Sequence, residues 1–196
     1  MVVVLTGVAV IMGGVLAFVN HVTHDPIEEQ KRIALENGIK VVMQDDNVKV
    51  TPAQTDTIKM QDDKGKEQTY IIYNNEKGAA VESTTMGFGG ALKVLVGFDH
   101  DGNILGYTLL EHQETPGLGA KADQWFQKGQ KGDIIGKNPG KNKLGVTKGN
   151  EGEIDAITAS TITSRAFLLA INNAYNVYKG NATDTQTGAK QTKKEK

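Results

Sequence analysis

Asp155-Ala-Ile-Thr-Ala-Ser-Thr-Ile-Thr-Ser164 places five hydroxyl side chains in the seven positions 158–164, directly before an apolar run. Apolar residues then recur at helical spacing as far as Val177, which predicts a helix of about four turns that begins inside this stretch. Ser and Thr favour helix N-termini because their oxygens accept bonds from amides that lack an intrahelical partner. The same amides attract phosphate groups. The residues alone therefore predict a hydroxyl-lined helix start, with capping and anion binding both open as its role.

The stretch resembles the flavinylation motif of the FMN-binding domain family, Asp-x-x-Ser/Thr-Gly-Ala-Thr-x-Thr/Ser-Ser. Thr161 stands at the position that carries FMN in that family through a phosphoester bond. The chain departs from the motif at Ala159 and Ser160, where the family usually has Gly and Ala. A second segment, Glu114-Thr-Pro-Gly-Leu-Gly119, resembles the family's segment beside the flavin ring. With the apolar N-terminus, the chain is most similar to the G component of the Rnf ion-translocating electron-transport complex, and less similar to the C component of the sodium-translocating NADH:quinone reductase.

The resemblance implies a membrane-anchored flavoprotein whose covalent FMN relays electrons within an Rnf-type ferredoxin:NAD oxidoreductase coupled to ion transport. It implies other membrane subunits as partners, and a flavin transferase that attaches FMN to Thr161 and recognises Asp155. The chain would hold no complete active site of its own. The further residues that the resemblance assigns to the cofactor are Thr158, Ser160, Thr163, Glu114, Thr115, Gly117, Leu118 and Gly119.

Composition excludes several classes of function. The formal net charge of −1 over 196 residues shows no basic excess, which argues against nucleic acid as a partner. Cysteine is absent, which excludes disulfides, thiolate catalysis and Cys-ligated iron–sulfur clusters. His21 and His24 are spaced three apart but have no acidic partner in any known metal motif, so we expect no metal site.

Val2 to Val19 carries no charged residue. As a helix, at ~1.5 Å per residue, it would reach about 27 Å, close to the hydrocarbon thickness of a bilayer. The lack of a basic n-region and of a small-residue cleavage site favours a retained single-pass anchor over a signal peptide. Gly7 and Gly14 share one helix face, which suits close approach of a neighbouring helix. The flanking charges give no orientation; a covalent tether suits an FMN domain on the extracytoplasmic side of the cell (inner) membrane, where lost cofactor could not be replaced.

The rest of the chain predicts an α+β fold, with an antiparallel sheet and packed helices tethered by the one N-terminal transmembrane helix. Asp25 and Pro26 are typical of a helix start and Gly38 of a helix end. The sequence also predicts hairpins around the turns at 74–78 and 99–103, a tight glycine bend at 87–90, and a short helix over 120–127. The expected divisions are a transmembrane anchor at 1–20, the FMN-binding domain at 21–180 and a flexible polar tail at 181–196.

Two other functions stay open at this point. A hydrolase would use Ser160 or Thr161 as nucleophile with His112 as base, although no nucleophile-elbow pattern surrounds either hydroxyl. An unflavinylated membrane-anchored scaffold is the second, and the departures at Ala159 and Ser160 keep it open. Covalent flavin in denatured protein would separate both from the flavoprotein.

Overall fold

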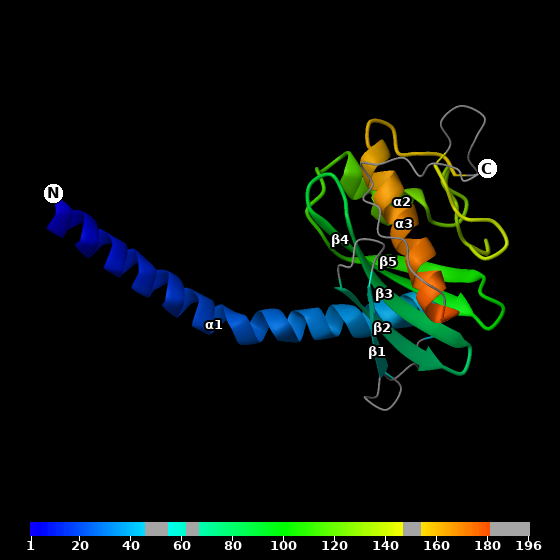
Figure 1. Ribbon diagram of the computed structural model, residues 1–196, viewed down its shortest axis with the longest axis horizontal. Helices are drawn as coiled ribbons and strands as arrows, with labels where there is room; N and C mark the ends of the chain where they lie inside the picture. The colour runs from blue at the N-terminus through cyan, green and yellow to red at the C-terminus, as the bar shows by residue number, and fades with distance from the viewer. Residues whose placement is uncertain (46–54, 62–66, 147–153, 181–196) are drawn as a thin grey trace. The chain divides into compact units, whose positions relative to one another are not determined.

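The computed structural model describes residues 1–45, 55–61, 67–146 and 154–180, which fall into two units, 1–36 and the described part of 37–196. In the second unit five antiparallel strands form one sheet in the order β1-β2-β3-β4-β5, with helices packed against it (Figure 1). The predicted α+β class is confirmed. The elements in chain order are α1 (Val2–Met43), β1 (Thr55–Gln61), β2 (Glu67–Asn75), β3 (Gly78–Met86), β4 (Ala91–Asp99), β5 (Ile104–His112), the short 3-10 helix η2 (Gly119–Lys121), α2 (Ala122–Trp125) and α3 (Thr161–Tyr178).

Helix α1 begins at Val2, and its first part is long and apolar enough to cross a membrane, with none of that part buried in the protein. The predicted start of a new helix at Asp25 is wrong, because α1 continues through Pro26 without a break. Proline removes only the one amide that would bond the carbonyl four residues earlier. Helix-favouring side chains follow it, and Arg32 pairs with Glu29 at 2.7 Å and with Glu36 at 2.6 Å, one turn to either side.

The last turns of α1 belong to the second unit and pack on the sheet. The predicted helix end at Gly38 is wrong, since α1 continues to Met43. A Cβ on Gly38 would lie 3.2 Å from Leu95 of β4 and 3.2 Å from Thr108 of β5, so glycine serves here for close approach between helix and sheet. The side chains of this segment buried against the sheet are Ile39, Val42 and Met43.

The two predicted hairpins are confirmed. Strands β2 and β3 pair around a turn at 76–77, and β4 and β5 pair around the turn at 100–103. In the second turn Asp99 accepts bonds from the Asn103 amide at 2.7 Å and from its side chain at 2.8 Å. Burial is the largest single effect on the pKa of Asp99 and raises it, but the hydrogen bonds of the turn together outweigh burial and lower that pKa. The sequence pattern does not single out strand β1, which lies at the edge of the described sheet and pairs there with β2.

Helix α3 lies over β3 and β4 and closes the main core (Figure 1). Phe167 of α3 stacks on Phe126 with ring centroids 4.4 Å apart and meets Tyr107 of β5 edge-on at 4.8 Å. Near its start, α3 accepts a hydrogen bond at the Ala166 carbonyl from Thr85 of β3, 2.9 Å long. The first turns of α3 are therefore fixed against the end of β3 and against the segment that follows β5.

Candidate functional site

The start of α3 is fixed by hydrogen bonds of a buried serine on the helix, and not by a capping side chain. Ser160 occupies the N-cap position, but its side chain makes no capping hydrogen bond, unlike most serines at this position. Instead the Ser164 hydroxyl donates to the Ser160 carbonyl and accepts from the Ile157 amide, both at 2.9 Å. Within the described residues this helix start has no side-chain cap, and uncapped amides at a helix N-terminus favour an anion. Thr161, the first residue of the helix, is half-buried.

Ala159 has a left-handed backbone, with φ at +62°. L-residues other than Asn and Asp rarely adopt this conformation because Cβ approaches the following carbonyl oxygen. Glycine adopts it without that cost. Of the two residues at which this chain departs from the flavinylation motif, Ala159 is thus the one whose backbone favours the motif's glycine.

Glu114 is a buried carboxylate that joins three segments. Its Oε1 accepts hydrogen bonds from the amides of Phe88 at 2.8 Å and Gly89 at 3.3 Å, in the turn between β3 and β4. Its Oε2 accepts from the Thr163 hydroxyl on α3 at 2.8 Å. Buried carboxylates need such donors to offset lost hydration. Glu114 therefore faces protein groups, and it positions the turn and α3 relative to each other.

Two glycines make room for this carboxylate. A Cβ on Gly119 would lie 2.5 Å from Glu114 Oε2 and 2.8 Å from Thr163 Oγ1. A Cβ on Gly87 would overlap Glu114 Oε1, and one on Gly89 would overlap the Gln113 carbonyl oxygen. The bend at 87–90, predicted from its glycines, is confirmed and is closed by a 2.8 Å bond from the Gly87 amide to the Gly90 carbonyl.

The segment between Glu114 and Gly119 forms an exposed turn. The Leu118 amide donates to the Thr115 carbonyl at 3.1 Å, and Gly117 has φ at +77°. Thr115, Gly117 and Leu118 are exposed, and nothing lies within 4 Å of the place where a Gly117 side chain would begin. Of the assigned cofactor residues, these three together with Thr158 and the half-buried Thr161 reach the surface, whereas Ser160, Thr163, Glu114 and Gly119 are buried.

Three exposed apolar side chains lie on the end of β3, the bend after it and the turn at 115–118. Phe88 is 71% exposed, Met86 51% and Leu118 41%. In the described part of the second unit, Val41 is the only other large apolar residue that is exposed. Sequence reasoning did not single out Phe88 or Met86; the available signal was a phenylalanine enclosed by the glycines of the 87–90 bend.

Trp125 connects the α2 region to the flavinylation-like motif. Its indole nitrogen donates to the Asp155 carbonyl at 2.9 Å, while its ring packs against the core. Trp125 is half-buried at the edge of the core, whereas its neighbour Phe126 is fully buried within it. Asp155 itself is exposed, so its carboxylate is accessible to a second protein.

The hydrolase arrangement is not formed. His112 Nδ1 contacts the Glu114 amide at 3.3 Å, and no hydrogen bond joins His112 to Ser160 or Thr161 within the described residues. In the same part of the chain no group of three or more His, Asp or Glu side chains is placed to hold a metal ion.

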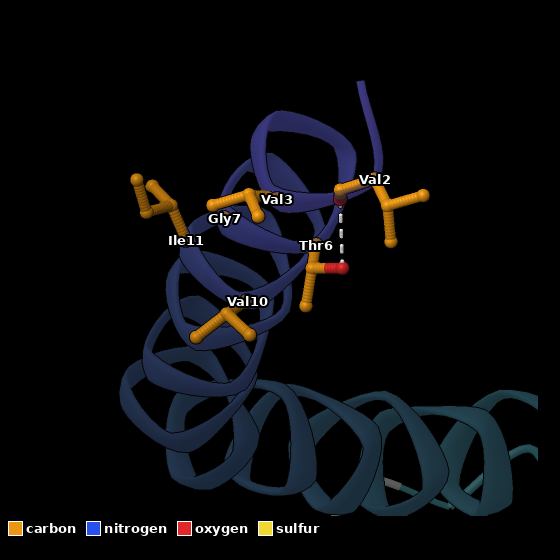
Figure 2. Close-up of a pocket in the computed structure, with 6 residues that line it drawn as sticks. All are labelled: Val2, Val3, Thr6, Gly7, Val10 and Ile11. Carbon is orange, nitrogen blue, oxygen red and sulfur yellow. Dashed lines mark hydrogen bonds between the residues drawn. The ribbon is translucent and has the colours of Figure 1, made fainter.

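A separate concave surface lies at the start of α1 (Figure 2). Its one polar side chain, Thr6, donates to the Val2 carbonyl at 2.9 Å. Lipid or a neighbouring helix would cover such a surface in a membrane. The lining residues are Val2, Val3, Thr6, Gly7, Val10 and Ile11.

Comparison with known proteins assigns both parts of the chain. Residues 87–176 match the FMN-binding domain, and residues 2–42 match the RnfG N-terminal region. The G component of the ion-translocating oxidoreductase complex of Shewanella piezotolerans is 32% identical, over 85% of this chain and 82% of that protein. The G component of the Na(+)-translocating ferredoxin:NAD(+) oxidoreductase complex of Acetobacterium woodii is 32% identical over 83% of each chain. The proton-translocating counterpart from Clostridium ljungdahlii is 31% identical over 87% of this chain and 85% of its own. The chain therefore belongs to the RnfG family, the G components of Rnf-type ion-translocating oxidoreductase complexes.

Proposed function

We propose that this protein carries electrons inside a membrane-bound ferredoxin:NAD oxidoreductase coupled to ion transport, through an FMN esterified to Thr161. The observation that carries the proposal is the half-buried Thr161 at a helix start that has no side-chain cap among the described residues. Thr161 lies two residues from Thr163. The Glu114 carboxylate bonds both the Thr163 hydroxyl and the Phe88 amide, and Glu114 directly precedes the exposed turn at 115–118. The relatives from Acetobacterium woodii and Clostridium ljungdahlii are subunits of ion-translocating ferredoxin:NAD(+) oxidoreductase complexes.

The residues of the site fit an FMN group. The first-turn amides of α3 and the exposed Thr158 would bond the phosphate, since amides at a helix N-terminus favour negative charge. The hydrogen bond between Thr163 and Glu114 would support the site by fixing α3 to the turn between β3 and β4. The turn at 115–118 and Phe88 offer apolar surface to a flat ring. The isoalloxazine supplies the redox chemistry when bound, taking up and releasing one or two electrons; the protein holds and orients it.

The membrane and maturation partners follow from the same proposal. Helix α1 would hold the domain at the cell membrane among the other subunits of the complex, with the FMN domain on the extracytoplasmic side. The exposed Asp155 would belong to the surface that the flavin transferase recognises.

The side of the membrane can be tested by labelling. Because the chain has no cysteine, Lys179→Cys creates a single label site. Reaction with a membrane-impermeant maleimide in intact spheroplasts would support the proposed side, and reaction only after lysis would contradict it.

The decisive test of attachment is the intact mass of the denatured protein after expression with a flavin transferase. The wild-type chain should carry the mass of one esterified FMN, and Thr161→Ala should lack it. The Thr161 hydroxyl makes no hydrogen bond within the described residues, so its removal should leave the fold intact. Thr158→Ala is the matched control, because it removes a neighbouring exposed hydroxyl without removing the attachment point, and it should keep at least part of the label. A wild-type chain without added mass would favour the unflavinylated scaffold, and a labelled Thr161→Ala would place the attachment elsewhere.

A further inference from the structure

We infer that Phe88 is a flavin-ring contact: the isoalloxazine ring of FMN lies against the Phe88 side chain, with Leu118 on the other segment that borders it. The inference rests on FMN being held at the start of α3, as proposed above. It adds a binding residue from the turn between β3 and β4 to the residues that the motifs themselves indicate.

The first step is position. The Glu114 carboxylate accepts one hydrogen bond from the Phe88 amide and another from the Thr163 hydroxyl. The amide and the hydroxyl are therefore separated by no more than two hydrogen bonds and one carboxylate group. Thr161 lies on the same first turn of α3 as Thr163. The turn between β3 and β4 and the start of α3 consequently lie at one end of the domain (Figure 1). A cofactor tethered at Thr161 thus has Phe88 within its surroundings.

The second step is rigidity. The backbone on both sides of Phe88 is fixed, because Gly87 and Gly89 approach Glu114 and Gln113 too closely for any side chain. Glu114 further bonds the amides of Phe88 and Gly89. The Phe88 ring is nevertheless 71% exposed. A fixed backbone that holds a large aromatic ring in solvent is a preformed contact for a partner, and not the result of a loose loop.

The third step is the chemistry of the occupant. Phe88 and Leu118 are exposed apolar side chains on two segments that both adjoin Glu114. Such side chains favour a flat aromatic group, and aromatic pairs gain energy from offset stacking or edge contacts. Leu118 directly precedes Gly119, where an added Cβ would meet Glu114 and Thr163. The residues matched by the FMN-binding domain begin at Gly87 and include Phe88. These observations favour the flavin ring over a protein partner as the occupant.

The test uses the full-length, flavin-loaded chain in detergent, with every spectrum normalised to the FMN content measured by intact mass. In Phe88→Ala, iodide quenching of flavin fluorescence should rise about twofold, because one of the two ring faces loses its aromatic cover. The flavin circular-dichroism band should weaken in parallel. Phe88→Tyr should restore both signals. Val41→Ala is the matched control, since Val41 is also exposed but lies on α1 beside Gly106 of β5, and it should change neither signal.

The outcomes separate the two proposals. Absence of FMN mass from the wild-type chain would contradict covalent attachment. Full FMN mass in Phe88→Ala with unchanged iodide quenching and circular dichroism would overturn the ring contact while leaving attachment in place. If Phe88→Ala instead lost binding to the other subunits, with an unchanged flavin signal, Phe88 would belong to a protein-docking surface and the ring contact would be wrong. Loss of FMN mass in Phe88→Ala and its return in Phe88→Tyr would also support the contact, whereas loss in both variants would count against it.

Discussion

Replacing Ala159 by glycine should stabilise the domain. The left-handed conformation destabilises an L-residue by about 1–2 kcal/mol, and Ala159 adopts this conformation with φ at +62°. Glycine costs about 0.5–1 kcal/mol through the greater freedom of the unfolded chain. The side chain of Ala159 is exposed, so its removal loses little buried area. The free energy of unfolding should therefore rise by roughly 0.5–1 kcal/mol, which for a domain of this size raises Tm by about 1–4 °C.

Trp125 provides the assay, because it is the only tryptophan and it bonds the Asp155 carbonyl, within the same segment as Ala159. Thermal unfolding followed by its fluorescence should show the higher Tm in Ala159→Gly. The matched control is Ala156→Gly, whose backbone is not left-handed and which should lose about 0.5–1 kcal/mol. A Tm for Ala159→Gly that is lowered as much as in the control would refute the reasoning, since the conformation at 159 would then not penalise a side chain.

Four more outcomes are expected. Ser83→Ala should be neutral or stabilising in urea unfolding, because the buried Ser83 hydroxyl has no partner within the described residues; Thr85→Ala, which loses a bond to α3, should cost about 1 kcal/mol. Burial raises the pKa of Tyr73 to about 12, so the native state keeps its proton longer than the unfolded chain and stability should fall from pH 10 to 12. Tyr73→Phe should flatten that fall, and an unchanged slope would exclude Tyr73 as its source. Glu114→Ala should cost about 2–4 kcal/mol by leaving three donors unpaired, and a loss below 1 kcal/mol would contradict the bridge. Deleting Val2–Val19 should leave a soluble domain with the wild-type Trp125 emission spectrum, and aggregation of the product would argue otherwise.

Sequence reasoning succeeded where the signal is local. The turn residues at 99–103 specify a hairpin through their own backbone preferences, and both hairpins are present. It failed at Gly38, where the same residue type that ends many helices serves instead for contact with Leu95 and Thr108. That reason lies in strands far along the chain. Proline at 26 was misinterpreted similarly, because one missing amide bond does not outweigh a long run of helix-favouring residues.

The site shows the same division. The resemblance identified Thr161 and the turn at 115–118 as neighbours of one cofactor, and it assigned Glu114 to the ring. The structure shows Glu114 bonded to Phe88 and Thr163, 26 and 49 residues away in the chain. Pattern and spacing along the sequence contain no information about such a bond, because it exists only once the β3–β4 turn and α3 have packed. Phe88 was missed for the same reason.

The close packing of Gly87 and Gly119 around Glu114 has a consequence for how substitutions combine. Gly119→Ala alone must displace both the Glu114 carboxylate and the Thr163 hydroxyl, whereas in a chain that already carries Glu114→Ala only the Thr163 hydroxyl has to move. The double variant should therefore lose less stability than the sum of the single losses, as expected for residues in direct contact. Epistasis of this kind makes the residue tolerated at each of the three positions depend on the other two. Segments that are distant in the chain would then change together during evolution, and a substitution judged harmful in this background could be neutral in another.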